Sequence, residues 1–469
     1  MSFTEIIFAP FLFFTFLFFF FFRNYPKAQI IVLLSASYIF YGWWNVTFLW
    51  LIIFSSLLDF SMGYLIFYAA TPARKKIYLT VSLAGNLGLL GYFKYANFFV
   101  ESLGGLLASL GLDPHWPVLN IILPVGISFY TFQTMSYSLD IYFGKIKPER
   151  SLLNFLFFVA AFPQLVAGPI VRAKDFLPQL KENLFRRSDD AGLFLILYGL
   201  AKKILLADML GFYMVDPVFQ MPERYSSFEL LLGTYAYAFQ IFFDFSAYSD
   251  IAIGLGLIFG LSIPVNFRSP YFAANPTDFW KRWHITLSTW LRDYLYIPLG
   301  GNRVGRRRRI FNLMTVMLLG GLWHGASWTF VMWGGLHGLY LAVYKLFDRE
   351  TDHSTRKYNF FGNVVFFHLT CLAWIFFRSG TLTSAGQYVS GIFDFNRPAG
   401  HLPLNTALGF LAISVIVHYL CEPNLDKIGR WFNAAHWSVR SVIIFCFFII
   451  FSIIGLKGIA QQAFIYFQF

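Results

Sequence analysis

The segment "IIFAPFLFFTFLFFFFFR", residues 6–23, is almost wholly apolar up to its last residue, Arg23. A helix of roughly 17–25 apolar residues crosses the hydrocarbon core of a bilayer, so this segment predicts a transmembrane helix. It does not have the form of a signal peptide, because no basic residue precedes it and no small-residue cleavage site follows it. Glu5 precedes it and Arg23 and Lys27 follow it, so the positive-inside rule places the N-terminus outside.

The whole chain has the composition of a membrane protein. Of its 469 residues, 57% are hydrophobic and 13% are charged, and 60 are Phe. Soluble proteins carry about twice that share of charged residues, and a soluble fold of this length could not bury so much apolar surface. We therefore predict an all-α integral membrane protein.

Further apolar segments follow the first along the chain. The second and third, "QIIVLLSASYIFYGWW" (29–44) and "LWLIIFSSLLDFSMGYLIFY" (49–68), continue the alternation of sides. The other expected spans lie near 77–93, 124–143, 192–214, 229–260, 311–346 (two helices), 360–377, 405–421 and 439–457. Shorter or proline-containing segments near 98–111 and 151–170 suggest re-entrant or broken helices. In total we expect about ten to twelve transmembrane helices, in a single domain over residues 1–469.

The net charge of +12 does not indicate nucleic-acid binding, because the charges lie in short loops between apolar segments. The dense cluster Arg306–Arg309 is interpreted as a cytoplasmic anchor on lipid headgroups, and contact with a phosphate-bearing substrate is the alternative. The three cysteines, Cys371, Cys421 and Cys446, show no metal-ligand spacing and cannot all be paired in disulfides.

Two carboxylates interrupt the apolar segment "YAYAFQIFFDFSAYSDIAIGLGL", residues 235–257. Asp244 and Asp250 would be costly at membrane depth unless they face the bundle interior, form pairs or line a wet cavity. They are six residues apart, about 120° in helical angle, and need not share a face. We count both as candidate substrate-binding residues.

The next segment, "NPTDFWKRWHITLSTWLRDYLYIPLGGNR" (275–303), is amphipathic and rich in aromatic residues. It predicts a helix that lies in the interface or lines the mouth of a funnel. Lys281 and Arg282, beside Trp283, could bind an anionic group such as a phosphate; the alternative is snorkelling cations with tryptophans at headgroup level. Asp293, in the same segment, is a further candidate substrate-binding residue.

Two of the nine histidines lie in dense Trp, Gly and polar surroundings: His284, and His324 in "GGLWHGASWTF" (320–330). Burial lowers an imidazole pKa and favours the neutral form, which can accept a proton from a hydroxyl. Trp323, next to His324, completes the candidate substrate-binding set. The remaining histidines are interpreted as packing or connecting residues: His115, His337, His353, His368, His401, His418 and His436.

Several motif classes are absent. The sequence has no H-E-x-x-H, G-x-S-x-G, P-loop or G-x-G-x-x-G motif. We therefore expect no metal site and no bound cofactor. Without further information, an enzyme and a proton-coupled secondary transporter that uses Asp244, Asp250 and His324 as a relay are equally compatible with the polar residues.

Several motifs along the chain resemble those of a known protein family. They include "ASYIFYGWW" (36–44), "LGYFKYANFF" (90–99), "LPVGISFYTFQTMSYSLDIY" (123–142), "FPQLVAGPIVR" (162–172), "FDFSAYSDIAIGLGL" (243–257), "RWHITLSTWLRDYLYIPLGGNR" (282–303), "MLLGGLWHGASWTF" (317–330) and "FIYFQF" (464–469). In this order they resemble the membrane-bound O-acyltransferase family, and within it the bacterial branch that acetylates alginate or peptidoglycan.

The resemblance implies a helical bundle around a central funnel or tunnel in the bacterial cytoplasmic (inner) membrane. It implies that His324 is the catalytic base and His284 the second active-site histidine. It further implies that an acetyl group passes from a cytoplasmic donor, acetyl-CoA, to an extracytoplasmic polysaccharide, directly or through a partner protein. The expected partners are bilayer lipids, the acyl donor and this acceptor, and not nucleic acid. Alginate or a similar exopolysaccharide is the first candidate acceptor, and peptidoglycan is the second.

Overall fold

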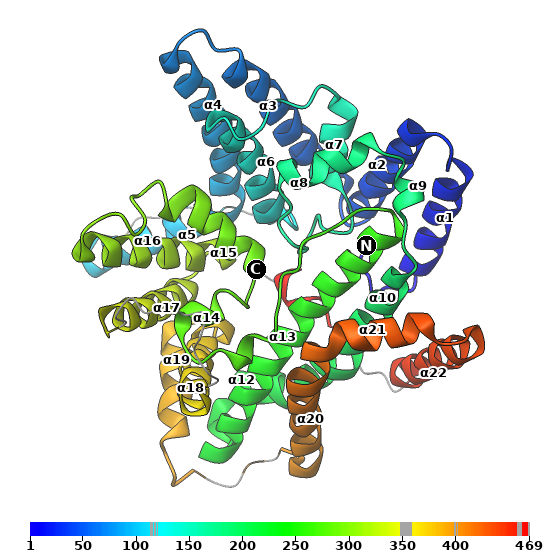
Figure 1. Ribbon diagram of the computed structural model, residues 1–469. Helices are drawn as coiled ribbons and strands as arrows, with labels where there is room; N and C mark the ends of the chain where they lie inside the picture. Colours follow the sequence, from blue (N-terminus) through cyan, green and yellow to red (C-terminus); the bar gives the residue numbers. More distant parts are fainter. Residues whose placement is uncertain are drawn as a thin grey trace. The chain divides into compact units, whose positions relative to one another are not determined.

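The computed structural model describes residues 1–469 with gaps at 113–115, 117–118, 120, 348–358, 398–399, 401, 457–461 and 468–469. Helices and connecting turns account for the described residues, and no strand occurs among them (Figure 1). This confirms the all-α prediction. Three of the histidines interpreted above as packing or connecting residues lie outside the described residues: His115, His353 and His401.

The chain forms two compact units. Unit 1 consists of Met1–Gly192 and Leu255–Pro264, and unit 2 of Leu193–Gly254 and Val265–Phe469. The single domain expected over residues 1–469 stays a prediction. Both catalytic candidates, and all the candidate substrate-binding residues, lie in unit 2.

Unit 1 contains the first nine α-helices. They are α1 Phe8–Phe21, α2 Pro26–Gly42, α3 Leu49–Phe67, α4 Pro72–Leu90, α5 Ala96–Ser109, α6 Ile127–Tyr142, α7 Leu152–Ala160, α8 Ala173–Phe176 and α9 Leu184–Arg187. The apolar segments at 6–23, 29–44, 49–68, 77–93 and 124–143 each form one of them, as the sequence predicts.

A buried polar network joins α3, α4 and α6. The carboxylate of Asp59 accepts hydrogen bonds from Ser82 Oγ, from Ser138 Oγ at 2.7 Å and from Asn86 Nδ2 at 2.7 Å. Ser55 Oγ in turn donates to Asn86 Oδ1 at 2.6 Å. Because each of these buried groups has partners, the polar atoms hold the three helices together instead of opposing their burial.

The broken helix expected over 151–170 is confirmed. Helix α7 ends at Ala160, and residues 161–171 are buried without being helical. Side chains from other helices bind the freed backbone: Gln133 Nε2 donates to Phe158 O at 2.5 Å, and Phe162 N donates to Ser37 Oγ at 3.1 Å. Protein groups thus replace the water that the backbone lacks there.

Unit 2 is built from α10 onward, and several of its helices contain π-helical turns. The elements are α10 Ala191–Ala201, η4 Lys202–Ala207, α11 Asp208–Leu210, η5 Gly211–Val215, α12 Asp216–Gln220, η6 Pro222–Arg224, α13 Ser227–Ile258, α14 Pro276–Phe279, α15 Ile285–Leu291, η8 Arg292–Tyr296, α16 Arg306–His324, α17 Trp328–Phe347, α18 Phe360–Arg378, α19 Leu382–Ile392, α20 Leu404–Ile416, η10 Val417–Cys421, α21 Leu425–Ala434, α22 Trp437–Leu456 and η12 Ile465–Phe467. The two helices expected over 311–346 are α16 and α17.

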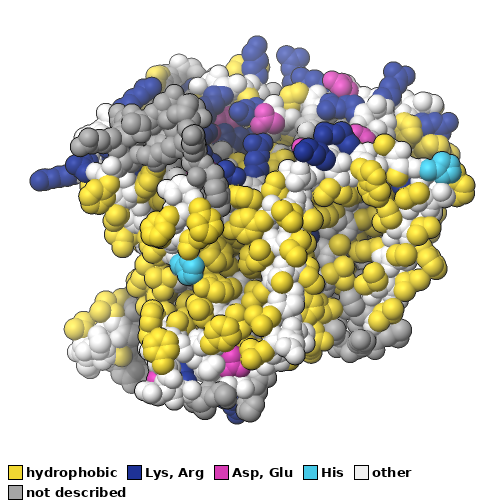
Figure 2. Space-filling view, turned by 60° about the horizontal axis from the view of Figure 1, so that its bottom comes forward, with side chains coloured by type: hydrophobic (Ala, Val, Ile, Leu, Met, Phe, Trp, Pro, Cys, Tyr) yellow, Lys and Arg dark blue, Asp and Glu magenta, His cyan; other side chains and the backbone are white. Residues whose placement is uncertain are grey.

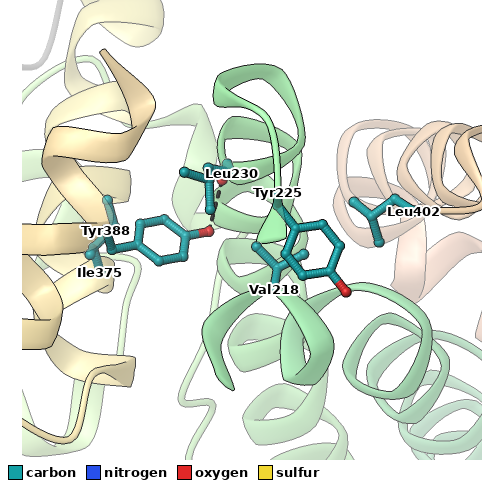
Figure 3. Packing of buried hydrophobic residues seen from close by; sticks show 6 residues of the cluster. All are labelled: Val218, Tyr225, Leu230, Ile375, Tyr388 and Leu402. Carbon is teal, nitrogen blue, oxygen red and sulfur yellow. Dashed lines mark hydrogen bonds between the residues drawn. The ribbon is translucent and has the colours of Figure 1, made fainter. Parts of the chain in front are cut away.

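One hydrophobic cluster of unit 2 fixes the first turn of α13 against α12, α18 and α19 (Figure 3). Its buried members are Val218, Tyr225, Leu230, Ile375, Tyr388 and Leu402. The Tyr388 hydroxyl donates to Leu230 O at 2.8 Å, so the polar end of this buried ring has a partner.

The prediction of one helix over residues 275–303 is wrong. The segment forms α14, α15 and η8, with a break between Phe279 and Ile285. At the break, His284 adopts a left-handed backbone conformation with φ 41° and ψ 55°. Backbone bonds to an adjacent strand-like segment hold it: Arg268 N donates to Arg282 O at 3.0 Å, and Ile285 N to Asn266 O at 2.9 Å. These tertiary bonds, which no local pattern reveals, replace the helical ones.

Four stretches of the described residues are helices long and apolar enough to cross a bilayer: Val46–Phe67, Ser227–Ile258, Phe360–Arg378 and Leu404–Ala434. Figure 2 shows hydrophobic side chains gathered over the middle of one face and Lys and Arg side chains along its edge. Such a surface is typical of a protein whose solvent is lipid. The number of ten to twelve spans stays a prediction.

Candidate active site

His324 is the last residue of α16, and glycines bring this end of α16 close to α17. A Cβ atom on Gly321 would overlap Phe330 O, and one on Gly334 would overlap Met317 O. Because neither glycine has a Cβ, the two helix backbones approach closely at this point. The close approach fixes the C-terminal end of α16 and with it the His324 side chain.

The His324 imidazole lies in an aromatic enclosure. Its ring centroid is 5.1 Å from that of Trp323, 4.9 Å from Trp333 and 5.4 Å from Phe377. The residue is only 3% exposed. Its Nδ1 atom lies 3.3 Å from the Tyr466 hydroxyl, within hydrogen-bond distance. A hydrogen bond at Nδ1 orients an imidazole and fixes its tautomer.

His284 is the second imidazole of the site, and the structure brings it next to the first. Its ring centroid is 6.2 Å from that of His324, 5.7 Å from Trp323 and 4.8 Å from Phe245. The residue is fully buried. A left-handed conformation at a non-glycine residue costs of order 1–3 kcal/mol, and such residues concentrate at functional sites.

The two candidate tryptophans have different places. Trp323 lies beside both histidines and contacts both rings. Trp283 is fully buried behind His284, where its ring stacks on Phe279 at 5.7 Å and packs on Trp374 at 4.9 Å. Trp323 is therefore within reach of a molecule at the histidines, whereas Trp283 supports the wall.

Tyr466 joins this site from the C-terminal segment, and the residue-by-residue sequence reasoning missed it. Its ring packs on Phe245 of α13 with centroids 3.9 Å apart, and on His324 at 5.7 Å. In Figure 1 the C-terminal segment, drawn in red, lies next to α13. The hexapeptide "FIYFQF" (464–469) was one of the motifs that resembled the family, but no functional role was predicted for its residues.

Asp244 is bound within a buried charge cluster. Lys203 Nζ lies 2.6 Å from Asp244 Oδ1 and 2.7 Å from Asp208 Oδ1. Asp244 Oδ2 accepts a hydrogen bond from the backbone N–H of Ile465 at 2.8 Å. The candidate substrate-binding residue Asp244 thus contacts the C-terminal segment.

Asp250 belongs to a second cluster around the preceding lysine. Lys202 Nζ lies 2.6 Å from Asp250 Oδ2 and 3.0 Å from Glu422 Oε1, and it donates to Ser246 Oγ at 2.8 Å. In a regular helix the side chains of consecutive residues point about 100° apart. Lys202 and Lys203 are consecutive, yet both contact α13. The π-helical turn η4, which begins at Lys202, widens the helix where they lie.

A cavity of about 1050 Å³ lies within unit 2 and carries both kinds of charge. Arg268, Lys281 and Arg282 are its cationic lining residues; its carboxylates are Asp250, Asp278, Glu422 and Asp426. Arg282 Nε pairs with Asp278 at 2.9 Å. Thus Lys281, Arg282 and Asp250, from distant parts of the candidate set, line one cavity.

Two aromatic side chains, Phe267 and Phe245, connect the wall of this cavity to His284. Phe267 lines the cavity, and Phe245 packs on Phe267 at 4.9 Å and on His284 at 4.8 Å between ring centroids. His284 and His324 do not themselves line this cavity. A passage that reaches His324 from both faces of the membrane stays a prediction.

Asp293 does not line this cavity, and its carboxylate is 2.7 Å from Arg292 Nε on η8. The arginine cluster Arg306–Arg309 forms the first turn of α16, at the opposite end from His324. His337 is fully buried and stacks on Phe279 at 5.6 Å, which agrees with the packing role expected of it.

Comparisons with known proteins identify the family. The model of the membrane-bound O-acyltransferase family matches residues 145–384. The chain is 36% identical to the probable alginate O-acetylase AlgI of Pseudomonas putida, with 100% of both chains covered. The chain belongs to the membrane-bound O-acyltransferase family. The resemblance stated from the sequence is thereby confirmed.

Other relatives of this membrane-bound O-acyltransferase carry related names. It is 43% identical to the probable alginate O-acetylase AlgI of Pseudomonas syringae pv. tomato, over 78% of this chain and 70% of the relative. It is 38% identical to the peptidoglycan O-acetyltransferase of Helicobacter pylori, over 79% of this chain and 74% of the relative. The protein is accordingly a multi-pass membrane acyltransferase, and the transporter alternative falls away.

Proposed function

We propose that this acyltransferase transfers an acetyl group to a hydroxyl of an extracytoplasmic polysaccharide, with His324 as the general base. The observation that carries the proposal is the buried His324, held at the end of α16 with Tyr466 at its Nδ1 atom, in a chain whose relatives are named O-acetylases. The proposed location is the bacterial cytoplasmic (inner) membrane.

The chemistry requires one proton acceptor and one group that stabilises negative charge. The acceptor oxygen attacks the carbonyl carbon of the acetyl thioester, and an imidazole takes the hydroxyl proton. The C–O bond forms, the C–S bond breaks, and the thiolate leaves with the proton that the imidazole returns. General base catalysis of this kind contributes roughly a hundred- to ten-thousand-fold.

His284 and Trp323 suit the second role. Both rings face the His324 ring, and an imidazole or indole N–H can donate to the oxygen of the tetrahedral intermediate. Donors held by packing need no reorganisation when the charge develops.

The proposed donor is acetyl-CoA, entering from the cytoplasm. The cavity of unit 2 supports this proposal because Arg268, Lys281 and Arg282 offer cationic groups for the phosphates of coenzyme A. Its wall residue Phe267 packs on Phe245, which in turn packs on His284.

The proposed acceptor is alginate or a similar exopolysaccharide, reached directly or through a partner protein. The names of the Pseudomonas putida and Pseudomonas syringae relatives support this choice. Peptidoglycan is the second candidate, and the name of the Helicobacter pylori relative supports it. The same chemistry serves both acceptors, since each offers sugar hydroxyls.

The test is His324→Ala in a strain that has no other copy of the gene. We expect O-acetyl groups on the acceptor to fall by about 100-fold or more, because the base is lost. Acetate released by mild alkali is measured separately from the exopolysaccharide and the peptidoglycan fractions. The fraction that loses acetate identifies the acceptor.

The matched control is His436→Ala, which removes an exposed imidazole that contacts only Ser438 among the hydrogen-bond partners described. Immunoblots of the membrane fraction establish equal abundance of both variants. Wild-type acetylation in both fractions with His324→Ala would refute the proposed base.

A further inference from the structure

The C-terminal segment, residues 462–466, is bound along its length by polar groups of unit 2, of which Lys203 and Asp244 are buried and Asp216 is partly exposed. Gln462 Nε2 donates to Asp216 Oδ2 at 2.5 Å, Lys203 Nζ donates to Ala463 O at 3.4 Å, and Ile465 N donates to Asp244 Oδ2 at 2.8 Å. Its side chains also pack: the rings of Phe464 and Tyr248 are 5.1 Å apart. This segment therefore depends on side chains of η4, α12 and α13 for its position.

The strongest of these contacts come from the Lys203 cluster. The side chains of Lys203 and Asp244 are 1% and 2% exposed, so their ion pair at 2.6 Å is shielded from water. A hydrogen bond from a backbone N–H to a carboxylate is about twice as strong as one between neutral groups. Lys203 Nζ also lies 4.7 Å from the Phe464 ring centroid. One cluster thus holds the segment at positions 463, 464 and 465.

The anchor at Ile465 is adjacent to the residue that meets the catalytic candidate. Tyr466 follows it directly, with its hydroxyl 3.3 Å from His324 Nδ1 and its ring on Phe245 at 3.9 Å. The rigid peptide unit that contains the N–H of Ile465 ends at Ile465 Cα, so this bond fixes the point from which the backbone continues to Tyr466. The Asp244 carboxylate itself contacts the segment and the lysine.

We propose that Asp244 and Lys203 are positioning residues that place Tyr466 against His324 by holding the C-terminal segment. They act through Tyr466 and touch neither the acyl donor nor the acceptor. This inference rests on the proposed function, and it replaces the substrate-binding role expected for Asp244.

The neighbouring Lys202 cluster differs in this respect. Lys202 binds Asp250 and Glu422, which line the cavity, and its described bonds go to α13 and η11 Glu422–Asn424. The two adjacent lysines of η4 therefore have different partners: Lys202 binds carboxylates of the cavity wall, and Lys203 contacts the C-terminal segment.

The first experiment measures the segment itself, without activity. Hydrogen exchange of the backbone amides in the C-terminal peptide is followed by mass spectrometry on the full chain in detergent micelles. In Asp244→Ala, the Ile465 amide loses its carboxylate acceptor, and we expect its exchange to be on the order of 10- to 100-fold faster than in wild type.

Glu229→Ala is the matched control. Glu229 also lies on α13, is buried, and accepts a backbone N–H from a distant segment, Leu402 N at 3.0 Å. Its loss should speed exchange near residue 402 and leave the C-terminal peptide at the wild-type rate. Equal effects of both variants on the C-terminal peptide would mean general loosening and would overturn the proposal.

A second variant leaves the buried ion pairs intact. Gln462→Ala removes the bonds to Asp216 and Gln240 while Lys203, Asp208 and Asp244 remain paired. We expect faster exchange in the same peptide and a partial loss of acetylation. This variant decides the question if Asp244→Ala does not fold.

The second experiment is a double-mutant cycle on O-acetylation. Tyr466→Phe and Asp244→Ala should each lower acetylation by about ten-fold or more, and the double variant should be no worse than Tyr466→Phe alone. Losses that multiply would show that Asp244 acts independently of Tyr466, which would overturn the proposal. If wild-type protein acetylates no glycan, the proposed function fails, and hydrogen exchange still decides whether Asp244 holds the segment.

Discussion

At the scale of single residues, two histidines that are equally buried differ in the side chains that surround them. His284 and His337 are both fully buried among aromatic rings. His284 lies beside Trp323 and 6.2 Å from His324, whereas His337 stacks on Phe279 and packs on Trp333. Only the first is placed to donate to a group that reacts at His324.

This difference predicts the effect of removing each imidazole. His284→Ala should lower O-acetylation by about 100-fold, the usual cost of losing a donor to the oxyanion. His337→Ala should lower it much less, because the ring it removes only packs. Acetate release per unit of membrane protein measures both, and equal losses would contradict the ranking.

At the scale of elements, close contact between α16 and α17 depends on glycine. Gly321 and Gly334 face each other across the contact, and a Cβ on either would overlap backbone atoms of the other helix. Small residues at such contacts let membrane helices pack closely when hydrophobic association is weak. His324 lies three residues beyond Gly321, so this contact determines its position.

Neighbouring glycines of α17 supply a paired test. Gly334→Ala should destabilise the protein by about 1–3 kcal/mol, because the backbone cannot yield easily, and should lower acetylation as His324 shifts. Gly335→Ala should be neutral, since its Cβ would meet only Leu318 Cδ2 at 3.6 Å. Thermal unfolding in detergent measures both, and an unchanged Tm for Gly334→Ala would contradict the role given to the contact.

At the scale of the whole molecule, charge and apolar surface set the orientation in the membrane. Exposed hydrophobic side chains such as Phe13 and Phe445 have lipid as their solvent. Arg306–Arg309 begin α16, and positive clusters of this kind remain on the cytoplasmic side. We therefore predict that the arginine end of α16 lies on the cytoplasmic side and that the end carrying His324 lies deeper in the membrane.

The orientation can be measured directly. With Cys371, Cys421 and Cys446 replaced by Ser, the variant Arg307→Cys should react with a membrane-impermeant maleimide only after the cytoplasmic face is opened, because Arg307 is exposed. Labelling of intact spheroplasts would contradict the assigned side.

The linear pattern was sufficient for properties that depend on composition and local periodicity. Long apolar segments predict membrane helices because an uninterrupted helix satisfies every backbone group in lipid, and α3, α13 and α18 follow that rule. Ordered motifs likewise predicted the family and singled out His284 and His324.

Tertiary contacts decided the rest, because they join residues that the chain keeps far apart. The break at His284 depends on bonds to Asn266 and Arg268, and the place of Asp244 depends on Lys203 and on Ile465, more than 200 residues away. No local period encodes such contacts. The apolar pattern therefore specified a membrane bundle, while contacts between distant residues of unit 2 brought His284 and Tyr466 next to His324.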